Sequence, residues 1–122
     1  MSHIVTIQVE VRDLEAVRSA CRRLKLPEPV FGKTELFETE VEGWLVNLPD
    51  WLYPVCCVLE TGEVKYDNYK GNWGDEKYLD SFVQSYSIEK ATLEARKKGY
   101  SVYEQPLEGG AVKLNITLGG AA

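Results

Sequence analysis

The sequence predicts an α+β domain in which an antiparallel sheet carries two helices on one face. The first observation is that residues 4–11 alternate apolar and polar side chains, as half-buried strands do. The second is that residues 14–25 and 75–98 repeat apolar residues at helical spacing. The third is a glycine-containing connection at 60–63 that joins two short strands. The order of elements favours a ferredoxin-like sandwich with an extra strand or strands.

The first strand and the first helix have clear boundaries. The apolar face of the strand consists of Val5, Ile7, Val9 and Val11. Asp13 is placed to accept hydrogen bonds at the start of the helix, which we expect to run to about Lys25. Pro27 and Pro29 stop it, because proline has no backbone donor. The sequence therefore predicts a loop from there to about Thr34.

The middle of the chain predicts a strand, a turn and a hairpin. Phe37, Thr39 and Val41 alternate with the acidic side chains Glu38, Glu40 and Glu42. Gly43 interrupts this alternation, so we expect a bend or bulge there. The apolar run 54–59 is typical of a central strand, and the turn at 60–63 leads into its antiparallel partner.

The second helix presents two apolar stripes instead of one. One stripe contains Leu79, Phe82, Val83, Tyr86 and Leu93, and the nearly opposite one contains Ile88, Ala91 and Ala95. Either a kink falls near Ser87 or both faces are covered. A hairpin over 100–118 then closes the sheet, so residues 1–118 form one domain and 119–122 a flexible tail.

Composition limits the classes of partner. A length of 122 residues suits one domain, and 44% hydrophobic with 27% charged residues is typical of a globular protein. The 14 basic and 19 acidic residues give a net charge of -5, which disfavours nucleic acid and anionic lipid surfaces as partners. We find no signal peptide and no segment long enough to span a bilayer, so we expect a cytoplasmic protein.

The residues that most often build metal or redox sites are few. The three cysteines are an odd number, and Cys56 and Cys57 are neighbours in a predicted strand, so we interpret all three as small buried hydrophobic residues. His3 is the single histidine and lies at the edge of the chain. We therefore expect neither a metal site nor a cofactor.

Two further motifs have a structural interpretation that outweighs the functional one. Glu38, Glu40 and Glu42 could flank a sugar or a divalent cation, but on one face of a strand they indicate a solvated surface. The segment Gly71-Asn72-Trp73-Gly74 lacks the length and the Lys-Ser/Thr ending of a phosphate-binding loop.

Aromatic residues in loops are the most suggestive functional signal. Trp51 and Trp73 both fall in predicted loops, where a large ring has less reason to be buried without a partner. Trp and Tyr are enriched at protein interfaces, so we predict a partner-binding site at Trp51, Tyr53, Tyr69 and Trp73. The competing interpretation is that most of these rings belong to the core.

A different class of function also fits the same region. Tyr66, Asp67, Trp73 and Tyr86 could line a cleft for a small molecule, with Asp67 as an acid or base in an enzyme. Because the sequence has no recognisable pair of nucleophile and base, the non-catalytic interaction protein is our first interpretation.

Several segments, taken in order, resemble a bacterial and plastid family called domain of unknown function 1257, which includes the plastid hypothetical reading frame 35 proteins. The segments are the opening Met1-Ser2-His3-Ile4, the junction at Asp13-Leu14, the hairpin 58–64, and the block from Phe82-Val83-Gln84-Ser85-Tyr86 to Gly99-Tyr100. The resemblance implies a cytoplasmic or stromal protein without an established activity, sometimes encoded beside ring-forming ATPases or ferredoxins. It supplies no catalytic residue, and it implies an ATPase as a possible protein partner.

Overall fold

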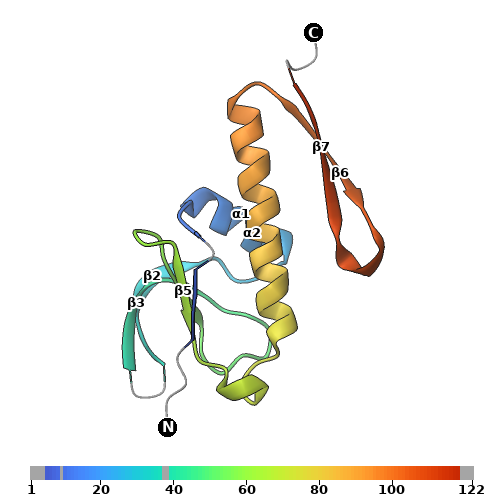
Figure 1. Ribbon diagram of the computed structural model, residues 1–122. Coiled ribbons are helices and arrows are strands. Elements are labelled where there is room, and N and C mark those ends of the chain that lie inside the picture. The colour runs from blue at the N-terminus through green and yellow to red at the C-terminus, as the bar shows by residue number, and fades with distance from the viewer. Residues whose placement is uncertain (1–4, 9, 37–38, 119–122) are drawn as a thin grey trace.

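A computed structural model of the chain describes residues 5–8, 10–36 and 39–118 and confirms the predicted α+β class (Figure 1). The elements in chain order are β1 (Val5–Gln8), α1 (Leu14–Arg23), β2 (Val30–Leu36), β3 (Thr39–Val46), β4 (Val55–Val58), β5 (Glu63–Tyr66), η1 (Tyr69–Gly71), α2 (Glu76–Lys97), β6 (Ser101–Pro106), η2 (Glu108–Gly110) and β7 (Val112–Thr117). The expectations for His3, Val9, Phe37, Glu38 and the tail 119–122 lie outside the described residues, as do those for the side chains of Val5 and Ile7.

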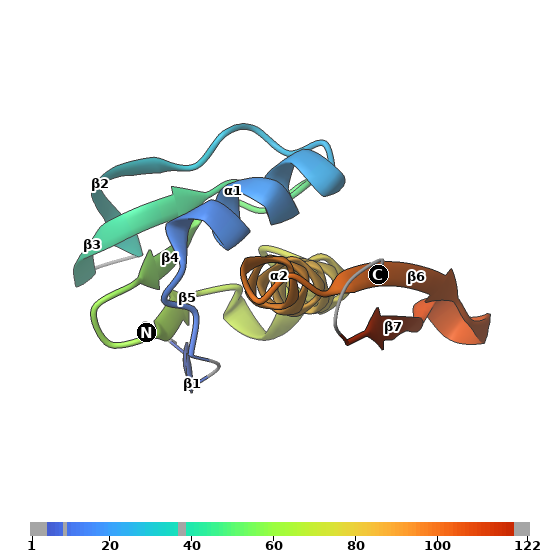
Figure 2. The ribbon, with the colours of Figure 1, turned by 90° about the horizontal axis from the view of Figure 1, so that it is seen from above.

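Five strands form one antiparallel sheet in the order β1-β5-β4-β3-β2. The strands β2 to β5 follow one another as a meander, and β1 adds to its β5 edge, where Val5 lies opposite Tyr66. Both helices pack on one face of this sheet, as the sequence predicted (Figures 1 and 2). The ferredoxin-like detail of that prediction is not confirmed, because in the meander each strand of β2 to β5 pairs with its neighbour in sequence.

The main core lies between the sheet and the two helices. Its fully buried members come from α1, β3, β4, β5, α2 and the segment between β1 and α1, and they include Val11, Val17, Val46, Val55, Cys57, Val64 and Phe82. A smaller cluster of Leu36, Val41 and Cys56 lies on the other face of the sheet. Because neighbouring side chains of a strand point to opposite faces, Cys56 and Cys57 enter different clusters. Both are fully buried, and Cys21 is nearly so, which confirms the interpretation of the cysteines as core residues.

Helix α1 begins where the sequence predicted and ends slightly earlier. The Asp13 side chain accepts a hydrogen bond from the backbone N–H of Ala16 at 3.2 Å, as an N-cap residue does. The helix ends at Arg23 instead of Lys25, because Lys25 has a φ of 57° and leaves the helical conformation. The backbone N–H of Leu26 then donates to the carbonyl of Cys21 at 2.8 Å, which closes the last turn.

The loop predicted up to Thr34 is wrong, because Val30–Leu36 forms strand β2. This strand pairs along its whole length with β3, from Val30 opposite Leu45 to Leu36 opposite Thr39. Strand β2 lies at the edge of the sheet, where Val30 is 61% and Phe31 56% exposed. Because such an edge strand does not have to bury one face, its sequence shows only weak alternation of apolar and polar residues.

Gly43 does not interrupt β3, and the bulge expected there is wrong, because the pairing with β2 runs through the glycine in unbroken register. The strand continues from Thr39 to Val46 through the glycine. A Cβ atom at Gly43 would lie 2.7 Å from the carbonyl oxygen of Cys57 and 2.8 Å from Sγ of Cys56. The glycine therefore allows close approach of β4, which is the other common role of glycine inside a strand.

Helix α2 is continuous, so its two apolar stripes reflect cover on both faces. Asp75 caps its start by accepting a hydrogen bond from the N–H of Lys77 at 2.9 Å. Leu79, Phe82 and Tyr86 enter the main core. On the opposite side, where Ile88 and Ala95 are buried, the hairpin of β6 and β7 runs along the helix (Figure 2).

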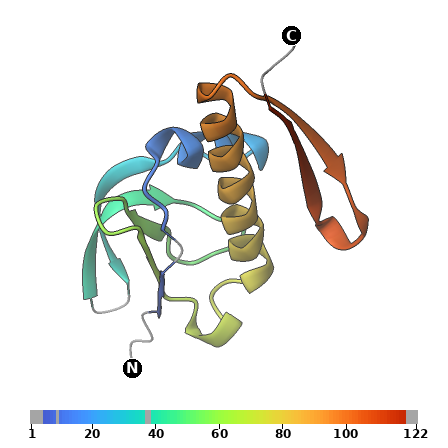
Figure 3. The same ribbon diagram turned by 45° about the horizontal axis from the view of Figure 1, so that its top comes forward.

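The last hairpin exists as predicted, but the expectation that it closes the main sheet is wrong. Strands β6 and β7 form a separate two-stranded sheet. Gly99, with a φ of 80°, turns the chain at the end of α2, and the hairpin then returns along the outer side of the helix (Figure 3). Arg23 of α1 forms an ion pair with Glu104 of β6 and lies 3.7 Å from Glu89 of α2, so three elements meet there.

Within residues 5–8, 10–36 and 39–118, neither helix is long and apolar enough to cross a membrane.

Two glycines that face each other in β2 and β3 provide a matched test of the packing. Gly43→Ala should lower the free energy of unfolding by about 1–3 kcal/mol, because its methyl group meets the backbone of β4. Gly32→Ala should be neutral or stabilising by up to about 1 kcal/mol, because the nearest atom to its Cβ, Cδ1 of Leu45, lies 3.9 Å away. Urea denaturation measures both, and equal costs would contradict the close approach of β4.

The cap of α1 predicts a pH dependence of stability. Burial raises the pKa of Asp13, but hydrogen bonds from Lys90 and from the N–H of Ala16 lower it more, so the net shift is downward. A lowered pKa in the folded state means that the stabilisation is present above the unfolded value of about 3.9 and is lost as the pH falls below it.

Asp13→Asn keeps a capping oxygen and removes the charge. We expect this variant to be less stable than the wild type near neutral pH and equally stable at about pH 2, as measured by urea denaturation across that range. Asp50→Asn, at an exposed position, is the control that should show no such convergence. A wild-type advantage that persists in acid would contradict the assignment.

Candidate functional site

Two loops bring the four predicted partner-binding residues together. Trp51 and Tyr53 lie between β3 and β4, and Tyr69 and Trp73 lie between β5 and α2. The Tyr69 and Trp73 rings stack with centroids 4.8 Å apart, and the Tyr53 ring meets Trp73 edge-on at 5.6 Å. These loops lie at one end of the sheet, beside the start of α2 (Figure 1).

Backbone hydrogen bonds hold the two loops in one arrangement. The N–H of Leu52 donates to the carbonyl of Trp73 at 2.8 Å, which joins the loops directly. Asn68 is buried, and its side-chain amide donates to the carbonyl of Gly74 at 3.2 Å. The N–H of Tyr69 donates to Oδ1 of Asp67 at 3.1 Å. The rings are therefore positioned before any partner arrives.

Left-handed backbone at two consecutive residues gives this turn its shape. Tyr69 has a φ of 47° and Lys70 a φ of 53°, a conformation that costs energy for residues other than glycine. The consequence is that the Tyr69 ring turns back onto Trp73 while 40% of the residue stays exposed.

Trp51 contributes more to the packing of the loops than the sequence suggested. Its ring meets Tyr66 edge-on at 5.7 Å, and its Nε1 donates to the carbonyl of Asp75 at 3.0 Å. Any side chain at Gly74 would overlap the Trp51 ring. Trp51 therefore supports the loops from the core side.

Leu52 is a part of the site that sequence reasoning missed. It is 59% exposed and lies between Trp51 and Tyr53, both of which are half-buried. No signal in the sequence indicated this residue, because Leu52 lies in a bend of the loop between β3 and β4, where no strand or helix periodicity indicates which side chains are exposed. We call Trp51, Leu52, Tyr53, Tyr69 and Trp73 the aromatic loop cluster.

Three of the four residues proposed for the alternative cleft are buried. Tyr66, Asp67 and Tyr86 are 6%, 1% and 3% exposed. Burial, with nearby Glu76 and Asp80, raises the pKa of Tyr66. Four hollows in the described surface have defined linings, and none of those four includes Tyr66, Asp67, Trp73 or Tyr86.

The Tyr86 hydroxyl already has a structural use. It accepts hydrogen bonds from the backbone N–H groups of Arg12 and Asp13, each at 3.1 Å. These two N–H groups lie at the start of α1, where no carbonyl of the helix can accept a hydrogen bond from them. Tyr86 therefore links α2 to the cap of α1, far along the helix from the aromatic loop cluster.

The cysteines lack the properties of nucleophiles. Burial raises the pKa of Cys21 and of Cys56 to about 11, and it raises the pKa of Cys57 still further. Thiols that stay protonated at neutral pH react slowly, because the thiolate is the nucleophile.

The acidic side chains of the described residues do not gather into a metal site. No group of three His, Cys, Asp or Glu side chains within the described residues could hold a metal ion. Glu40 and Glu42 are exposed on β3, which fits the predicted solvated surface.

Comparisons of the chain with protein-family models, with curated proteins and with solved structures found no match. The resemblance to the domain of unknown function 1257 family therefore remains a prediction.

Removing the Tyr86 hydroxyl tests its structural role. Tyr86→Phe should lower the free energy of unfolding by about 1–3 kcal/mol, because two partly buried N–H groups lose their acceptor. Tyr103→Phe is the control, since Tyr103 is 67% exposed, and it should leave stability unchanged. An unchanged midpoint of thermal unfolding in Tyr86→Phe would contradict the role and return Tyr86 to the candidates for ligand binding.

Proposed function

We propose that this chain is a non-catalytic interaction protein that docks a protein partner through the aromatic loop cluster. The observation that carries the proposal is the combination of stacked rings with exposed apolar side chains at Leu52 and Tyr69. Apolar and aromatic side chains dominate the binding energy of protein interfaces when they are buried on association.

The fixed arrangement of the cluster favours binding. Association is opposed by the entropy lost when side chains become ordered at an interface. Here the Tyr69 and Trp73 rings are already stacked, and the N–H of Leu52 is already bonded to Trp73. Binding of a partner to these residues therefore costs less conformational entropy than binding to a mobile loop that must first become ordered.

The surroundings of the cluster carry both signs of charge. Asp50 and Lys70 are exposed beside it, and Lys77 lies 4.0 Å from Asp75 at the start of α2. Charged residues around an apolar centre are typical of the rim of an interface. The finer proposals, that the partner is an ATPase and that binding takes place in the cytoplasm, rest on the resemblance and on the composition alone.

Capture of partners from an extract of the native host tests the proposal. Leu52→Ala and Tyr69→Ala should each reduce recovery of a specific partner at least about fivefold, because each removes exposed apolar area at the centre of the cluster. Both variants should keep the wild-type melting temperature to within a few degrees. Mass spectrometry of the captured protein then shows whether it is an ATPase.

Two controls separate docking from folding. Tyr103→Ala removes an exposed ring from β6, away from the cluster, and should leave capture unchanged. Trp51→Ala should lower both stability and capture, because Trp51 supports the loops. The proposal is overturned if Leu52→Ala and Tyr69→Ala recover the same partners in the same amounts as the wild type.

A further inference from the structure

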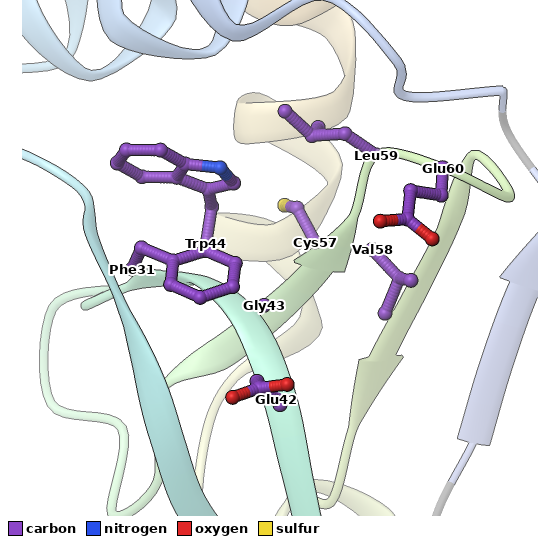
Figure 4. Close-up of a pocket in the computed structure, with 8 residues that line it drawn as sticks. All are labelled: Phe31, Glu42, Gly43, Trp44, Cys57, Val58, Leu59 and Glu60. Atoms are coloured by element: carbon purple, nitrogen blue, oxygen red, sulfur yellow. The ribbon is translucent and has the colours of Figure 1, made fainter.

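A second surface feature lies outside the aromatic loop cluster. A hollow of about 260 Å³ opens on the helix-facing side of the sheet, between β3 and the end of β4 (Figure 4). The lining residues that matter here are Phe31, Glu42, Trp44, Cys57, Leu59 and Glu60. None of the residues that line the hollow belongs to the aromatic loop cluster, so the two features can be tested separately.

Two aromatic rings form adjoining walls of the hollow. The rings of Phe31 and Trp44 have centroids 5.6 Å apart and an interplanar angle of 66°. They come from directly paired positions of β2 and β3, so the sheet itself sets their arrangement. Figure 4 shows both rings on one side of the hollow, with Leu59 and Glu60 across from them.

The Trp44 ring already attracts a cation from this chain. The guanidinium carbon of Arg18, on α1, lies 5.5 Å from the ring centroid. Such a contact arises because the face of an aromatic ring carries partial negative charge. The Trp44 ring therefore attracts positive charge, and a further cation would share this ring with the Arg18 guanidinium or displace the guanidinium from it.

Carboxylates line two other sides of the hollow. Glu42 comes from β3 and Glu60 from the turn after β4, and neither forms an ion pair within 4.0 Å of another described residue. Arg12, whose guanidinium donates to the Glu60 carbonyl, is paired with Glu10 at 2.6 Å. Lys33 lies opposite Glu42 in the strand register and is exposed.

The lining discriminates between kinds of cation. Apart from the carboxylates of Glu42 and Glu60, the lining side chains are apolar or, at Cys57, a thiol, so the aromatic side of the hollow offers no strong acceptor to the N–H groups of an unmethylated ammonium. An N-methylated ammonium keeps its charge and needs no acceptor, and aromatic walls recognise such ions. We propose that this hollow binds an N-methylated ammonium ion, either a free choline-type molecule or a methylated lysine side chain.

Titration of the ¹⁵N-labelled full chain tests the proposal through the indole N–H signal of Trp44. Choline and a short peptide with one trimethyllysine should each shift this signal to saturation in the millimolar range. The neutral isostere of choline, 3,3-dimethylbutan-1-ol, should cause no saturable shift. Equal affinity of the two cations indicates recognition of the ammonium group alone, and tighter binding of the peptide indicates a methylated protein as the source.

Matched variants identify the groups responsible. Glu42→Gln and Glu60→Gln should each weaken choline binding about fivefold, as the loss of one nearby charge predicts. Glu40→Gln, an exposed carboxylate on the same strand that does not line the hollow, should leave it unchanged. The proposal is overturned if the isostere binds as well as choline, if the Trp44 signal does not shift, or if both lining variants bind choline like the wild type.

Discussion

Burial of the inner stripe of α2 against the sheet is the constraint on which the rest of the structure depends. Phe82 and Leu79 lie almost fully in the core together with Val64 of β5 and Val55 of β4. Full burial of one such side chain contributes about 1.5–3 kcal/mol, so this stripe is a large part of the stability of a small domain. Because α2 is continuous, its position also determines where the loops at its start and the hairpin at its end can lie.

The aromatic loop cluster follows from that constraint. The chain must pass from the end of β5 to the start of α2 within residues 67–75, and it does so with left-handed turns and a glycine against Trp51. The polar groups of this segment are bonded inside the loops, to Asn68, Asp67 and the backbone of Trp73. The apolar side chains that find no place in the core are therefore held on the surface, where a partner can cover them.

Local patterns in the sequence predicted the elements, and tertiary contacts decided their arrangement. Asp13 and Asp75 identified both helix starts, because capping depends on residues only two or three positions away. Strand β2 was missed because an exposed edge strand has no strict alternation. The place of the last hairpin depends on contacts such as Arg23 with Glu104, which are 81 positions apart. For the site, composition identified the rings, but their exposure depends on how two distant loops pack, and Leu52 gave no signal of its own.

The hairpin on the outer side of α2 and the loops at the start of α2 differ in how firmly they are held. A two-stranded hairpin is only marginally stable by itself, and β6–β7 leaves Ile116 and Leu118 exposed while it contacts one side of the helix. We therefore expect it to open at a lower free energy than the five-stranded sheet. The aromatic loop cluster lies at the start of α2 and is bonded to residues that the main core supports. Opening of the hairpin leaves those bonds intact, so the proposed docking surface keeps its shape whenever the main core is folded.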